Sequence, residues 1–128
     1  MWLLKRKQKN SGDRAEVAAV QYLSSQGLVV LARNFQPPGR GMADLDIVMR
    51  DGDGTIVFVE VRLRSSSTFG GAAESITVSK QKRLIQAAQY FLLRFDVIPV
   101  CRFDVVVFEE DKKLTPLWLK HAFDVKKN

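Results

Sequence analysis

Four charged residues in the middle of the chain have the types and spacing of a hydrolytic site. Asp44 and Asp46 alternate with apolar residues in ADLDIV, and Glu60 and Arg62 alternate with apolar residues in VFVEVRLR. Because the side chains of a strand alternate between its two faces, each pair is expected on one face of its strand. Carboxylates that meet beside a basic group suit Mg²⁺ or Mn²⁺, and such an ion assists phosphodiester hydrolysis.

The segment DGDG between these two strands predicts a tight hairpin. Asp46 lies six residues before Gly52 and Glu60 lies six residues after Gly54, so a symmetric hairpin places the two carboxylates opposite each other. The competing interpretation is a polar sheet face whose Asp–Arg and Glu–Arg pairs are exposed to water and contribute little. The strongly apolar neighbours favour a central hairpin over a bare edge.

A glutamate in the first predicted helix, SGDRAEVAAVQYLSSQG at residues 11–27, falls in an unexpected place. Ser11 or Asp13 is the expected N-cap and Gly27 the expected stop. At about 100° per residue the apolar residues form one arc, and Glu16 falls inside it. A carboxylate directed at the core is costly unless it is paired, protonated or bound to a metal ion. The alternative is that Glu16 lies at the helix margin and reaches water.

The second predicted helix, SKQKRLIQAAQYFLLRF at residues 79–95, begins with cations. Ser79 is its expected cap, Gln81 falls on the apolar face, and Lys80 falls at the margin of that face. The first-turn amides, Lys80 and Gln81 could together hold a phosphate group. Equally, the lysines and the arginine of this turn could form a solvated helix end.

The elements that must position these residues form an α/β fold. The pattern α-β-β-β-α-β predicts one mixed sheet with helices packed on it. Residues 1–10 are expected to form a basic N-terminal arm, 11–128 a single domain, and SSSTFGGAAE a mobile loop. The segment LWLKHAF is expected as a short strand or helical turn at the sheet edge. The expected strands are LVVLARNF, ADLDIVMR, TIVFVEVRLR and CRFDVVVFEE.

Composition favours a polyanionic partner in a reducing compartment. Lysine and arginine total 20 against 14 for aspartate and glutamate, which gives a net charge of +6. No apolar run approaches the ~20 residues of a membrane span, and the first ten residues lack the order of charges of a signal peptide. The single cysteine, Cys101, is expected as a small core residue in a cytoplasmic protein.

An ordered series of motifs resembles one family of bacterial proteins. GDRAEVAAVQYLSSQGLVVLARNF, ADLDIV, VFVEVRLRSSSTFG, SKQKRLIQAAQYFL and RFDVV resemble the YraN family over residues 11–124. The resemblance implies a restriction-endonuclease-like fold, similar to that of archaeal Holliday-junction resolvases. Its expected form is an αβββαβ core with a mixed central sheet flanked by helices.

The resemblance also implies roles for residues. Glu16 matches the helix glutamate of the family, Asp46 and Glu60 match the core metal ligands, and Asp44 stands where a glutamate is usual. The family strand motif FVEVK is FVEVR here, so Arg62 occupies the position of the catalytic lysine. Arginine supplies charge and donors, but it does not deprotonate and its planar fork has a different reach.

The leading hypothesis is therefore a nuclease that uses Mg²⁺ or Mn²⁺ on DNA, with branched DNA as a candidate substrate. The alternative is a nucleic-acid-binding protein with the nuclease fold and a decayed site, because Arg62 replaces lysine. A homodimer is a candidate assembly, since a four-way junction has two symmetric scissile positions. The expected catalytic residues are Glu16, Asp46, Glu60 and Arg62, the expected metal ligands Asp44, Asp46 and Glu60, and the expected substrate contacts Arg64, Lys80 and Gln81.

Other conspicuous residues have plainer expected roles. Asp104 in RFDVV is expected to pair with Arg102 or with a neighbouring strand. His121, the single histidine, is expected to be structural or at the surface. Trp118 and Phe123 are expected to pack at the sheet edge rather than to stack on bases.

Overall fold

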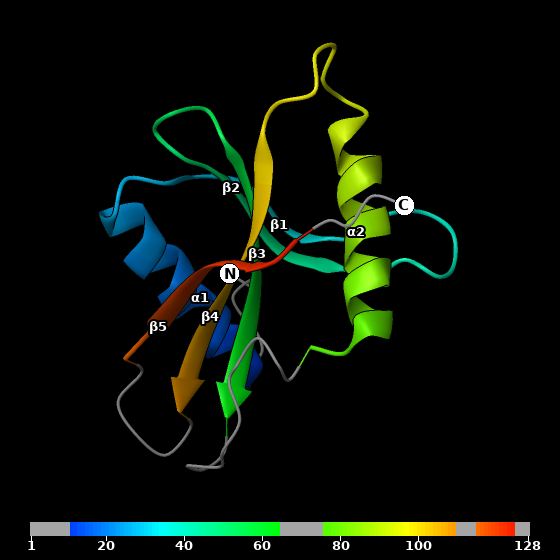
Figure 1. The fold of residues 1–128 in the computed structure, drawn as a ribbon. Coiled ribbons are helices and arrows are strands. Elements are labelled where there is room, and N and C mark those ends of the chain that lie inside the picture. The colour runs from blue at the N-terminus through cyan, green and yellow to red at the C-terminus, as the bar shows by residue number, and fades with distance from the viewer. Residues whose placement is uncertain (1–10, 65–75, 110–114, 125–128) are drawn as a thin grey trace, which may run out of the picture.

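The computed structural model describes residues 11–64, 76–109 and 115–124, and Figure 1 shows how their two helices and five strands are arranged. The predicted basic arm and the SSSTFGGAAE loop lie outside these residues and stay predictions. The elements are α1 (Ser11–Ser25), β1 (Val29–Phe35), β2 (Leu45–Arg50), β3 (Ile56–Arg64), α2 (Val78–Leu92), β4 (Cys101–Glu109) and β5 (Leu117–Phe123).

The sheet is mixed, with the strand order β1-β2-β3-β4-β5. All neighbouring strands are antiparallel except β3 and β4, which are parallel. A parallel pair needs a long crossover, and α2 lies within the connection between these two strands. The predicted α/β class and αβββαβ order of the restriction-endonuclease-like core are confirmed, and the LWLKHAF segment is the edge strand β5.

The two helices cover opposite faces of the sheet, as Figure 1 shows. Alternation along β3 divides the core, because Phe58 packs on the α2 side while Val57 and Val59 pack on the α1 side. No described helix is long and apolar enough to cross a membrane. The buried residues of α1 are Ala15, Ala19 and Leu23, and those of α2 are Leu84, Ala87, Ala88, Phe91 and Leu92.

Helix ends follow the chemistry of their caps, with one correction. Gly27 ends α1 as predicted, with φ of +99°, and the Leu28 amide donates to the Leu23 carbonyl at 3.1 Å. The predicted cap Ser79 is wrong, because Thr77 caps α2. The Thr77 hydroxyl accepts from the Lys80 amide at 3.0 Å, which leaves Ser79 inside the first turn.

The hairpin register brings the two halves of the predicted site to the same level. The turn closes as expected, with the Asp51 amide donating to the Thr55 carbonyl at 2.8 Å. The β2–β3 register pairs Ile47 with Val59. Continuing it by one residue places Asp46 opposite Glu60, as the symmetry about DGDG predicts.

Candidate active site

The main-chain hydrogen bonding between β2 and β3 is replaced, at Asp46, by a hydrogen bond to a side chain. The last main-chain pair at this end is Ile47 with Val59. One step further, the Val61 amide donates to Asp46 Oδ2 at 2.9 Å. A carboxylate thus takes the place of a main-chain acceptor, and this hydrogen bond fixes Asp46 against the middle of β3.

Glu60 lies beside Asp46 on the face of the sheet that α2 covers. It is 8% exposed, and together with Asp46 and Leu84 it lines a small hollow against the core. Two cations reach the same oxygen from different elements. Arg62 Nη1 lies 3.7 Å from Glu60 Oε2, and Lys80 Nζ lies 3.5 Å from it. The structure therefore brings together Asp46, Glu60, Arg62 and Lys80.

The two carboxyl groups compete for the same positive charge. Burial, followed by the charge of Asp46, raises the pKa of Glu60 to about 7, against the opposing effect of Lys80 and Arg62. Burial also raises the pKa of Asp46, although the hydrogen bond from Val61 opposes this. Burial thus outweighs the effect of the two cations on the pKa values of this pair.

Glu16 approaches the same pair from the helix on the other face. Its side chain is 16% exposed, and its Oε1 lies 3.8 Å from Arg33 Nη2 of β1. That oxygen is buried and accepts no hydrogen bond. Burial raises the pKa of Glu16, and the charge of Asp46 contributes to the rise. The carboxylate therefore faces β1 and Asp46 instead of bulk water.

Asp44 does not join this group. It precedes β2, is exposed, and accepts a 3.5 Å hydrogen bond from the Gln36 side chain. The regular alternation of the strand does not extend back to it, because Leu45 and Val48 both pack in the core on the α2 side. Its role as a metal ligand stays a prediction that no contact in the structure supports.

The remaining predicted substrate contacts have different surroundings. The Gln81 side chain donates to the Ile76 carbonyl at 3.0 Å, so it braces the entry to α2. Arg64 is the last residue of β3, four residues after Glu60 and partly buried, where its main chain is in register with Glu109 of β4.

The donor set fits a hard divalent cation. Asp46 and Glu60 supply only oxygen atoms, and burial raises the pKa of both carboxyl groups. Glu16 lies close enough for the charge of Asp46 to raise its pKa as well. Within the described parts of the chain, no group of three or more histidine, cysteine, aspartate or glutamate side chains is arranged to hold a metal ion. Mg²⁺ commonly uses one or two protein carboxylates and completes its shell with water and phosphate, so a pair is sufficient.

A separate buried carboxylate, Asp104 of β4, is structural, although it adjoins Val105, the residue in register with Glu60. Arg102 Nε donates to both oxygens of Asp104, at 3.0 and 3.2 Å, which confirms the predicted pairing. The Trp118 indole donates at 2.9 Å and the His121 amide at 3.1 Å, so the two β5 residues support this network. Phe123 stacks on Phe103 with centroids 4.7 Å apart, as edge packing predicts.

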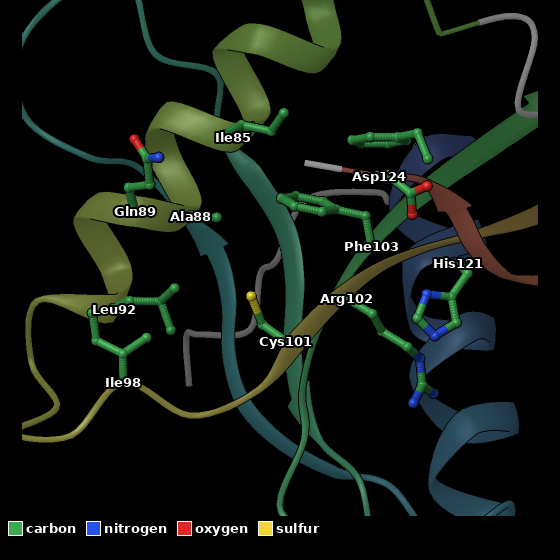
Figure 2. Close-up of a pocket in the computed structure, with 11 residues that line it drawn as sticks. Ile85, Ala88, Gln89, Leu92, Ile98, Cys101, Arg102, Phe103, His121 and Asp124 are labelled. Carbon is green, nitrogen blue, oxygen red and sulfur yellow. The ribbon is translucent and has the colours of Figure 1, made fainter. Parts of the chain in front are cut away.

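A larger pocket, which no sequence motif predicts, lies between α2, β4 and β5. It measures about 800 Å³ and is mainly apolar. Cys101 lines it and is half-buried rather than fully in the core, and burial raises the pKa of its thiol (Figure 2). No carboxylate of the Asp46–Glu60 pair lines this pocket.

Comparison with known proteins assigns the family. The model of the uncharacterised protein family UPF0102 matches residues 15–108. The chain belongs to the UPF0102 family. This is the YraN family that the motifs indicated. A UPF0102 protein of Acidovorax sp. (strain JS42) is 46% identical, over 89% of this chain and 84% of its own. A UPF0102 protein of Janthinobacterium sp. (strain Marseille) is 50% identical, over 89% and 87%.

A solved structure gives a weaker likeness. A chain in the structure of an EndoMS–dsDNA2 complex is similar at a TM-score of 0.43 and 17% identity. The similarity covers 77% of this chain and 37% of that one. At this level the likeness leaves the function of UPF0102 open, so the function has to be argued from the site.

Proposed function

We propose that this UPF0102 protein is a divalent-metal-dependent nuclease that hydrolyses phosphodiester bonds of DNA. The observation that carries the proposal is the Asp46–Glu60 pair, in which Glu60 is buried and Asp46 is half-buried. The pKa values of both carboxyl groups are raised, and the side chains of Arg62 and Lys80 lie at ion-pair distance from one Glu60 oxygen. A carboxylate pair for a metal ion next to cations for a phosphate is what this chemistry requires.

Each side chain has a distinct task in this mechanism. Asp46 and Glu60 would hold Mg²⁺ or Mn²⁺, which when bound would activate water and neutralise developing phosphate charge. The Val61 amide holds Asp46 in place. Arg62 and Lys80 would bind the non-bridging phosphate oxygens, and Glu16 would support Asp46 from the α1 side. In the reaction the water oxygen bonds to phosphorus, the bond to the leaving oxygen breaks, and solvent takes up and returns the protons.

The charge of the chain supports nucleic acid as the substrate. The net charge is +6, and Lys82 and Arg83 are exposed on the same turn as Lys80. Such a surface attracts the phosphate backbone without reading sequence. The resemblance to junction resolvases makes branched DNA the first form to compare with duplex DNA. The predicted homodimer and cytoplasmic location remain part of this proposal.

Cleavage of labelled DNA by matched variants tests the proposal. Duplex, single-stranded, flap and four-way-junction DNA are incubated with Mg²⁺ or Mn²⁺ and the wild type, Glu60→Gln or Asp96→Asn. Glu60→Gln keeps the size of the side chain and removes its charge, whereas Asp96 is an exposed aspartate between α2 and β4. We expect cleavage by the wild type and Asp96→Asn only. Equal cleavage by Glu60→Gln would remove the carboxylate pair from the mechanism.

Binding without cleavage is the second candidate, because arginine occupies position 62. In that case the protein binds DNA with an affinity that falls steeply with salt, and no metal ion or DNA form gives hydrolysis. Wild-type cleavage that is lost in Glu60→Gln excludes this candidate.

A further inference from the structure

The arginine at position 62 leaves one task without an obvious residue. Phosphodiester hydrolysis benefits from a compact positive charge next to the attacking water and the phosphate. A lysine ammonium is a point charge with three donors, whereas a guanidinium spreads its charge over a planar fork suited to two parallel hydrogen bonds. Arg62 is thus better suited to binding a phosphate group through two hydrogen bonds than to orienting a single water molecule.

The structure brings a lysine to the same place from another element. Lys80 lies on α2, eighteen residues after Arg62 of β3 in the sequence. Its Nζ lies 3.5 Å from Glu60 Oε2, and Arg62 Nη1 lies 3.7 Å from that same oxygen. The side chains of Lys80 and Arg62 are 32% and 31% exposed, so both remain accessible to a substrate.

The first turn of α2 is built to hold Lys80 in position. The Lys80 amide donates to the Thr77 hydroxyl at 3.0 Å, and the Gln81 amide donates to the Thr77 carbonyl at 2.9 Å. The Gln81 side chain also donates to the Ile76 carbonyl at 3.0 Å. Three hydrogen bonds, one of them the regular helical bond between Gln81 and Thr77, therefore anchor the main chain on both sides of Lys80.

We propose that Lys80 supplies the catalytic ammonium that the family resemblance places on β3, and that Arg62 binds the phosphate. The inference rests on the proposed nuclease activity. Lys80 donates hydrogen bonds to the attacking water and to a phosphate oxygen, and it transfers no proton. Gln81, expected from the sequence to contact substrate, is a positioning residue that acts through the helix start.

Exchanging the two cations between α2 and β3 tests this assignment. The variants are Lys80→Ala, Arg62→Ala, Arg62→Lys and the double variant Lys80→Ala/Arg62→Lys. Arg50→Ala, which removes an exposed cation at the far end of β2, is the control. We measure kcat and KM for DNA cleavage, DNA affinity in EDTA, and the unfolding midpoint of each variant. The affinity and the midpoint report on binding and folding independently of cleavage.

The expected pattern separates catalysis from binding. Lys80→Ala lowers kcat by about 10²- to 10³-fold and weakens binding in EDTA by less than about fivefold, as loss of one phosphate contact does. Arg62→Ala raises KM by about tenfold with a smaller change in kcat. The double variant recovers at least about a tenth of wild-type kcat, because it returns a lysine to β3. A purely structural role for Lys80 gives no such recovery.

Each contrary result has its own meaning. Near-normal kcat in Lys80→Ala, with loss of cleavage in Arg62→Ala, overturns the inference and assigns the role to Arg62. Failure of the double variant to recover, while it folds normally, also overturns it. Absence of cleavage by the wild type with every metal and DNA form overturns the nuclease proposal itself, and the role of Lys80 with it.

Discussion

Two regions of the same sheet bury an acidic side chain, and the partners of the two side chains differ. Asp104 is fully buried, and its two oxygens accept from the Arg102 guanidinium, the Trp118 indole and the His121 amide at 2.9–3.2 Å. Glu60 is almost as buried, yet its cations lie 3.5 and 3.7 Å away, and its pKa is raised to about 7. Burial alone therefore does not distinguish the two carboxylates, whereas the distances to their partners and the raised pKa of Glu60 do.

The difference follows from what each region has to hold. The Asp104 network joins β4, β5 and the β2–β3 hairpin, since Arg102 Nη1 also donates to Asp51 Oδ2 at 3.1 Å. His121 adopts a left-handed φ of 53°, which turns its amide toward Asp104. The Asp46–Glu60 pair lies where the β2–β3 ladder ends, and its two cations come from different elements, β3 and α2. One region is fully hydrogen-bonded, whereas the raised pKa of Glu60 makes the other unfavourable to stability at neutral pH.

The largest effect on stability is expected at Asp104. Asp104→Ala leaves the Arg102 guanidinium buried beside too little negative charge, which costs about 3–5 kcal/mol of the free energy of unfolding. Asp51→Ala removes the partly exposed partner of the same arginine and costs about 1 kcal/mol or less. Urea unfolding at pH 7 measures both. Equal losses in the two variants would mean that Asp104 does not dominate the network.

The pH dependence of stability is expected to come from the other region. Folding raises the pKa of Glu60 from 4.5 to about 7, so the folded state favours the protonated acid. This contribution to stability is fully present below pH 4.5 and is lost as the pH rises through 7, to the extent of about 3 kcal/mol. Asp46 contributes with the same sign, while Lys80 and Arg62 oppose the rise in pKa.

A neutral side chain at position 60 removes this pH dependence. Glu60→Gln is expected to be more stable than the wild type at pH 8 and to show a flatter profile between pH 5 and 8. Urea unfolding at several pH values in EDTA measures the difference, and Asp96→Asn is the control for loss of an exposed carboxylate. Parallel profiles for the wild type and Glu60→Gln would contradict the raised pKa.

A bound metal ion is expected to offset the loss of stability that the Asp46–Glu60 pair causes at neutral pH. At ten times its dissociation constant, a ligand that binds only the folded state stabilises it by about 1.4 kcal/mol. Mn²⁺ or Mg²⁺ should therefore raise the unfolding midpoint of the wild type and of Asp51→Ala, but not that of Glu60→Gln. This measurement needs no DNA. An equal rise in all three proteins would place metal binding elsewhere.

Sequence reasoning reached the parts of the site that local geometry determines. The DGDG turn fixes the register of its hairpin, so Asp46 and Glu60 could be placed opposite each other. Glu16 could be identified because a charge inside an apolar arc is unusual. The Asp104–Arg102 pair follows from alternation along one strand. In each case the residues are near in sequence or related by one short turn.

The remaining contacts of the candidate site depend on how the helices and strands pack, which no local sequence pattern encodes. The contact of Lys80 with Glu60 depends on how α2 lies across the sheet after a long crossover. The ion pair of Arg33 with Glu16 follows a register shift between Val30 and Ala32, which changes the face that later residues occupy. The position of Asp44 was mistaken for part of a regular strand because nothing in ADLDIV marks where alternation begins.

The smallest expected effect connects helix capping to the site. Thr77 and Ser79 are both suitable N-caps, and only the extended conformation of Thr77, with φ of −65° and ψ of 160°, distinguishes them. Thr77→Ala should cost about 1 kcal/mol of stability, and Ser79→Ala much less. If the cap holds Lys80 in position, Thr77→Ala should also lower kcat severalfold with KM unchanged, and Thr77→Ser should restore it. A loss of stability without a change in kcat would show that the cap stabilises the helix but is not needed to place Lys80 beside Glu60.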